Sequence, residues 1–114
     1  MPPKRIFVFD HSGTLGVFPT GRPVKGRGTD QIILQNDSGV DVHWYVPKGV
    51  FDDVNDHHED VPSGQQSGPQ TVNAQTARVV AYRVTLAKRA RGLKKKLHQL
   101  AKIKSDPIII IDVD

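Results

Sequence analysis

The chain has 114 residues and no cysteine. That length suits one domain with a single core, and the missing cysteine excludes disulfide bonds, thiolate metal sites and a cysteine nucleophile. The 37% hydrophobic content is enough for a globular core, and the net charge of +4 is compatible with an acidic partner. We therefore expect residues 1–114 to form one domain.

The first ten residues, MPPKRIFVFD, place two prolines and two basic residues before a short apolar run. This run is too short for a secretory signal, and no apolar run in the chain approaches the length that spans a membrane. We therefore expect a cytoplasmic protein that does not bind membranes.

Residues 4–10 (KRIFVFD) are rich in branched and aromatic side chains, which favours a strand. Residues 11–29 then hold five glycines and two prolines. Because glycine and proline oppose helix formation, we expect loops there and no helix directly after Asp10.

Residues 31–35 (QIILQ) predict a second strand, and the turn-forming NDSG sequence separates it from VDVHWYVP. We interpret these two strands as a hairpin. In the second strand apolar residues alternate with polar ones, so one face points inward and the other toward solvent or a partner. The expected inner residues are Val42, Trp44 and Val46.

Residues 48–70 are polar and rich in glycine, proline and serine toward their end, which predicts a long loop. This loop contains the densest group of possible metal ligands in the chain, because imidazoles and carboxylates lie side by side in sequence. The candidate ligands are Asp56, His57, His58 and Glu59. The spacing matches neither a calcium-binding EF-hand nor a zinc-binding helix, so a solvated acidic loop is the simpler interpretation.

Residues 77–86 predict one strand, with Val80, Tyr82 and Val84 on its inner face. From residue 87 to residue 104 the period changes, because three leucines fall at the spacing of one helical face. We expect a basic helix there, followed by a strand in residues 106–113 (DPIIIIDV). Four consecutive isoleucines are typical of a strand in the middle of a sheet.

The basic helical segment, residues 88–104, could bind nucleic acid through Arg89, Arg91, Lys94, Lys95 and Lys96. It contains no aromatic side chain on which a base could stack, which argues against a dedicated single-strand binder. Two simpler alternatives are a solvated helical face and attraction to the acidic residues of the 48–70 loop.

The order of these predicted strands resembles that of the cupredoxin-like β-sandwich. The resemblance depends on DQIILQNDSGVDVHWYVPKGVF, VPSGQ, VVAYRVTL and SDPIIIIDV, although alternating valines also fit immunoglobulin-like domains. It implies an all-β sandwich, to which the leucine spacing adds one basic helical segment before the last strand. A type 1 copper centre needs a cysteine, so we expect the scaffold without copper and without another cofactor.

The sequence VFDHSGTL also resembles the nucleophile motif of haloacid dehalogenase-like phosphatases, and Asp10, Gly13, Thr14 and Leu15 match it. Ser12 occupies the position where these phosphatases have a second aspartate. The family's fold also needs a helix soon after the motif, where this chain has glycine and proline. Phosphotransfer by Asp10 is therefore an alternative, and the simpler interpretation is a strand followed by a turn.

These observations favour a small binding or interaction module with an unidentified protein partner over an enzyme. Nucleic-acid binding by the basic segment is the main alternative. A sandwich with unpaired sheet edges could also form a homodimer through them.

Overall fold

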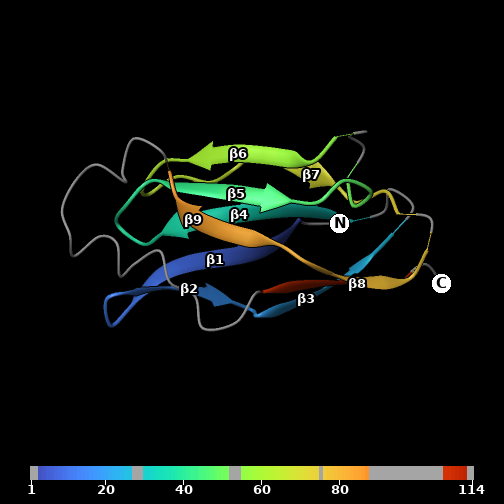
Figure 1. Ribbon diagram of the computed structural model, residues 1–114, viewed down its shortest axis with the longest axis horizontal. Helices are drawn as coiled ribbons and strands as arrows, with labels where there is room; N and C mark the ends of the chain where they lie inside the picture. The colour runs from blue at the N-terminus through green and yellow to red at the C-terminus, as the bar shows by residue number, and fades with distance from the viewer. Residues whose placement is uncertain (1–2, 27–29, 52–54, 75, 88–106, 113–114) are drawn as a thin grey trace.

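The computed structural model describes residues 3–26, 30–51, 55–74, 76–87 and 107–112 (Figure 1). Every regular element in these residues is a strand, which confirms the all-β prediction at this level. The strands are β1 (Lys4–His11), β2 (Thr14–Phe18), β3 (Gly21–Lys25), β4 (Gln31–Asp37), β5 (Val42–Val46), β6 (His57–Val61), β7 (Gln70–Thr71), β8 (Arg78–Ala81), β9 (Arg83–Leu86) and β10 (Ile108–Asp112). Within the described ranges no helix is long and apolar enough to cross a membrane.

The strands form three small sheets, with the orders β2-β1-β4-β7, β3-β10-β8 and β6-β5-β9. The first two sheets are mixed, because β1 runs parallel to β4 and β10 runs parallel to β3 while their other neighbours are antiparallel. The third sheet is antiparallel throughout.

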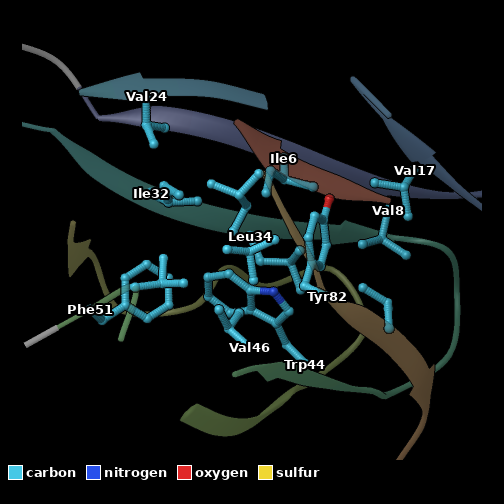
Figure 2. Packing of buried hydrophobic residues seen from close by; sticks show 14 of the residues in the cluster. Ile6, Val8, Val17, Val24, Ile32, Leu34, Trp44, Val46, Phe51 and Tyr82 are labelled. Atoms are coloured by element: carbon cyan, nitrogen blue, oxygen red, sulfur yellow. The ribbon is translucent and has the colours of Figure 1, made fainter. Parts of the chain in front are cut away.

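One hydrophobic core joins the three sheets (Figure 2). Trp44 and Tyr82 are its largest fully buried side chains, and Ile6 and Leu34 of the first sheet lie near them in Figure 2. The predicted inner residues of β5 are all fully buried, so the alternation of apolar and polar residues correctly identified the inward face of this strand.

The predicted strand of residues 77–86 is two strands, separated at Tyr82. β8 belongs to the β3-β10-β8 sheet and β9 belongs to the β6-β5-β9 sheet, so this segment connects the two sheets. The Tyr82 backbone N–H donates to the Pro107 carbonyl oxygen at 3.0 Å, outside either ladder. The predicted inner residues Val80, Tyr82 and Val84 are buried, so the alternation was right although the strand changes sheets.

The predicted hairpin of residues 31–46 is wrong, because β4 and β5 belong to different sheets. Asn36 holds their connection through its buried side chain, whose Nδ2 donates to the carbonyl oxygens of Val40 at 2.7 Å and Val61 at 2.9 Å. Its Oδ1 accepts from the Ser38 hydroxyl at 2.6 Å. The turn residues were therefore recognised, but they redirect the chain to another sheet instead of back along β4.

Residues 11–29, expected to be loops, contain β2 and β3. Ser12 and Gly13 have φ values of 52° and 89° and form the two-residue turn between β1 and β2. The Asp10 carboxylate accepts a hydrogen bond from the Gly13 N–H at 2.9 Å, as a turn-forming aspartate does. No helix follows directly after Asp10, because β2 begins at Thr14, and the described residues contain none of the strand–helix units on which the phosphatase fold is built.

The 48–70 segment was wrongly predicted as a loop, because it contains β6 and the first residue of β7. In β6 the buried positions are His57 and Val61, and acidic or basic side chains occupy the positions between them. A strand with so few apolar residues gives a weak alternation signal, which is why it was missed.

The isoleucine strand β10 lies in the middle of its sheet, as predicted. It is not apolar toward the interior on both sides, however: Ile109 and Ile111 are buried, whereas Ile110 is 38% exposed and its cross-strand neighbour Val79 is 61% exposed. The predicted basic helix of residues 87–104 lies outside the described residues, apart from Ala87.

Candidate functional site

Six chemically active side chains lie on the outer face of the β6-β5-β9 sheet, and we call this set the histidine face. Two rows of three cross the sheet, with one residue from each strand in every row. The first row is Asp60, His43 and Thr85, and the second row is His58, Tyr45 and Arg83. Figure 1 shows the three strands lying side by side.

The histidine face follows from the alternation in β5. Because the alternate residues of this strand fill the core, His43 and Tyr45 must point outward. The ladders to β6 and β9 then place one outward residue on each side of both. β5 is thus the central strand, and both its neighbours contribute to the site.

Asp60, His43 and His58 form a hydrogen-bonded chain. The His43 Nδ1 lies 2.7 Å from the Asp60 Oδ1, and the His43 Nε2 lies 2.9 Å from the His58 Nδ1. An ionised carboxylate can only accept, so the His43 Nδ1 carries a hydrogen. When His43 is neutral its Nε2 accepts from the His58 Nδ1–H; when His43 is protonated the direction of this hydrogen bond reverses.

Tyr45 lies between His58 and Arg83 in the second row. Its ring centroid is 5.0 Å from that of His58, at an interplanar angle of 46°. An open hollow of about 330 Å³ lies over this part of the sheet, lined by His43, Tyr45, His58, Arg83 and Thr85. The hollow therefore offers an aromatic surface bordered by hydrogen-bonding groups.

Several of these groups are available to a ligand. Neither the exposed Arg83 guanidinium nor the hydroxyls of Tyr45 and Thr85 make a hydrogen bond or ion pair with any described residue. The carboxylate of the face, Asp60, is at the far end of the first row and is hydrogen-bonded to His43 in the same row. The Arg83 end of the face thus presents a cation and two hydroxyls, and no carboxylate of the two rows lies next to Arg83.

Of the four residues proposed from sequence as metal ligands, the structure brings only His57 and Glu59 together. Asp56 accepts from the Lys48 backbone N–H at 2.9 Å. His57 points inward, with its ring 5.0 Å from Trp44, and its Nε2 lies 3.1 Å from the Glu59 Oε1. His58 lies on the opposite face of β6, so the set does not converge on one point. No three His, Asp or Glu side chains in the described part of the chain are arranged to hold a metal ion together.

The other sequence candidates are not among the six residues that define the histidine face. Asp10 is in the β1–β2 hairpin. The proposed nucleic-acid ligands Arg89, Arg91, Lys94, Lys95 and Lys96 lie outside the described residues, so that hypothesis stays a prediction.

Sequence reasoning found His43 as an outward strand residue but not its partners. Tyr45, Arg83 and Thr85 were visible as outward positions of two predicted strands, and the signal that joins them is the register between those strands. His58 and Asp60 were missed as partners because β6 was expected to be a loop. The chain matches no protein-family model, and a search of curated proteins returned no match.

Proposed function

We propose that this protein is a small cupredoxin-like or immunoglobulin-like β-sandwich that acts as a binding module, and that its histidine face recognises an anionic group of a ligand or partner. The observation that carries this proposal is the exposed Arg83 guanidinium beside Tyr45 and Thr85, at one end of a hollow of about 330 Å³. We also propose that the protein is cytoplasmic.

The chemistry of the Arg83 end favours an anion. A guanidinium presents several N–H donors in a planar fork that matches the oxygens of a carboxylate or phosphate. The hydroxyls of Tyr45 and Thr85 can donate to the same group. Asp60, which would repel an anion, lies in the opposite corner of the two rows and is hydrogen-bonded to His43.

The remaining part of the face suits the rest of such a ligand. Tyr45 provides an apolar ring surface in the middle of the hollow, and His58 lies beyond it. A ligand with an anionic group at Arg83 and an apolar or ring portion over Tyr45 would fill both. Either a free metabolite or an acidic side chain of a protein partner could supply this anion.

The test is a titration of the isotope-labelled protein with inorganic phosphate and, separately, with acetate, followed by backbone NMR shifts. We expect the largest shifts at Tyr45, Arg83 and Thr85. Arg83→Gln should weaken phosphate binding by about tenfold or more, since a charge-assisted hydrogen bond contributes about 1.5–3 kcal/mol.

The matched control is Arg78→Gln, which removes the same charge from β8, outside the histidine face. It should leave phosphate binding nearly unchanged. Equal weakening by the two variants, or shifts centred away from the face, would overturn the proposal. Shifts with phosphate but not acetate would identify phosphate groups as the ligand class.

A further inference from the structure

The His43 and His58 side chains bring two ring nitrogens together on the outer face of the sheet. Their facing atoms, His43 Nε2 and His58 Nδ1, lie 2.9 Å apart, and their ring centroids are 5.2 Å apart. The two residues come from adjacent strands and are diagonal neighbours, because His58 lies two residues along β6 from Asp60, the residue directly opposite His43. Both line the open hollow, so a small ion can reach them from solvent.

We propose that His43 and His58 together bind a divalent transition-metal ion of the zinc or nickel type, through His43 Nε2 and His58 Nδ1. This proposal does not depend on anion recognition by Arg83. It also differs from the site expected from sequence, because it pairs His58 with a residue of another strand instead of with its neighbours in the chain.

The spacing of the two nitrogens fits a shared metal ion. Zinc-to-imidazole bonds are about 2.0–2.1 Å long, so two such ligands lie about 2.9 Å apart at a right angle and about 3.3 Å apart at a tetrahedral angle. The observed 2.9 Å is therefore already within half an ångström of what a metal needs. The rings must rotate to turn both lone pairs toward the ion, but the strands need not move apart.

The neutral histidine pair can bind the metal while each ring keeps its one hydrogen. In the neutral pair, His43 carries its hydrogen on Nδ1 and His58 carries its hydrogen on Nδ1. A metal bound to His58 Nδ1 requires this hydrogen to move to the other ring nitrogen, His58 Nε2. No side chain among the described residues is hydrogen-bonded to His58 Nε2, so this nitrogen can take the hydrogen. Two neutral imidazoles thus become two neutral ligands without loss of a proton; a pair that starts with His43 protonated releases one proton.

Asp60 stabilises the site through its hydrogen bond to His43. It accepts from His43 Nδ1 at 2.7 Å, on the side of the ring opposite the metal-binding nitrogen. A carboxylate in this position fixes the tautomer and orientation of a metal-binding histidine and strengthens its donor atom. Its negative charge also offsets the Arg83 guanidinium, which lies two strands from His58 with Tyr45 between them.

With two protein ligands, the remaining coordination positions would hold water, so the affinity is lower than that of a three-ligand site. The test is calorimetric titration of the full chain, without an affinity tag, with zinc chloride and nickel chloride in a buffer that does not chelate metals. We expect one ion per chain. His43→Gln and His58→Gln should each weaken binding by at least about tenfold, and Asp60→Asn by about tenfold.

His11→Gln is the matched control, because it removes an exposed histidine at the end of β1 and should leave the affinity unchanged. Backbone NMR spectra report whether each variant is folded. Nickel-induced broadening of the unmodified protein provides a second measurement, and we expect its centre at His43 and His58. Three results would overturn the proposal: no binding, broadening centred elsewhere, or folded His43→Gln and His58→Gln variants that bind the metal as tightly as the unmodified protein.

Discussion

The β6-β5-β9 and β3-β10-β8 sheets have the same number of strands and share one core, but their outer faces are opposite in character. The first carries the six polar and aromatic residues of the histidine face. The second carries Val79 and Ile110, both exposed, with Pro23 paired to Ile110 in the same row. A single segment, β8 followed by β9, contributes an edge strand to each.

The difference shows that inward and outward residues carry separate information. Inward residues of both sheets are mostly apolar, with valines in each, because they fill one interior. Outward residues make no contribution to that interior, so nothing in the packing requires an arginine or a histidine there. The concentration of hydrogen-bonding side chains on one outer face is therefore the better guide to function.

The largest expected effect comes from truncating two neighbouring residues of β5, one inward and one outward. Trp44 is fully buried, whereas Tyr45 lines the open hollow. We expect Trp44→Ala to lower the free energy of unfolding by about 3–5 kcal/mol, because it leaves a large cavity. Tyr45→Ala should cost about 1 kcal/mol or less. Denaturant unfolding followed by circular dichroism measures both.

Similar losses in the two variants would mean that Tyr45 is part of the core, and would remove it from the proposed recognition surface. Phosphate titration of Tyr45→Ala completes the comparison. If the ring supports the ligand, this variant loses affinity while keeping most of its stability.

The sequence was sufficient to identify the inner residues of β5, β8 and β9, because alternation is a local property of each strand. It was insufficient for the pairing of strands. QIILQ and VDVHWYV read as a hairpin, since a turn sequence separates them, yet Asn36 directs β5 into another sheet through bonds to Val40 and Val61. Those contacts depend on where β6 lies, which no local pattern reports.

The candidate site depends even more on pairing. Each of its six residues is an ordinary outward position in its own strand, and the ladders alone bring His43 next to His58 and Tyr45 next to Arg83. The dense group of ligands around His57 attracted attention because its members are adjacent in sequence. In a strand, however, adjacent residues point to opposite faces, which separates His57 from His58.

A smaller effect tests whether the apolar outer face of the β3-β10-β8 sheet is open to solvent. Val79 is 61% exposed and Val80 is 7% exposed, so substituting each with threonine compares the two faces of β8. Val80→Thr should lower the free energy of unfolding by about 1–3 kcal/mol, because it buries a hydroxyl. Val79→Thr should change it by about 0.5 kcal/mol or less.

Thermal and denaturant unfolding of the two variants, at equal protein concentration, checks this expectation. If Val79→Thr costs as much as Val80→Thr, then the outer face of this sheet is covered in solution, and the contrast with the histidine face no longer holds.

The smallest effect at neutral pH concerns Tyr82, where the chain passes from one sheet to the other. Its hydroxyl is buried and has no hydrogen-bond partner among the described residues, so Tyr82→Phe should preserve or slightly raise stability at pH 7. Burial raises the pKa of Tyr82 above the ordinary tyrosine value of about 10, and the nearby Arg22 guanidinium opposes only part of this effect.

A raised pKa makes the protein less stable in alkali. Above about pH 10 the unfolded chain releases the tyrosine proton while the folded protein retains it, so the free energy of unfolding falls by up to about 1.4 kcal/mol for each further pH unit. Tyr82→Phe removes this contribution. Urea unfolding at pH 8, 10 and 11 should therefore show a widening stability advantage for the variant, whereas a constant difference would mean that the hydroxyl at the junction of the two sheets is accessible to water.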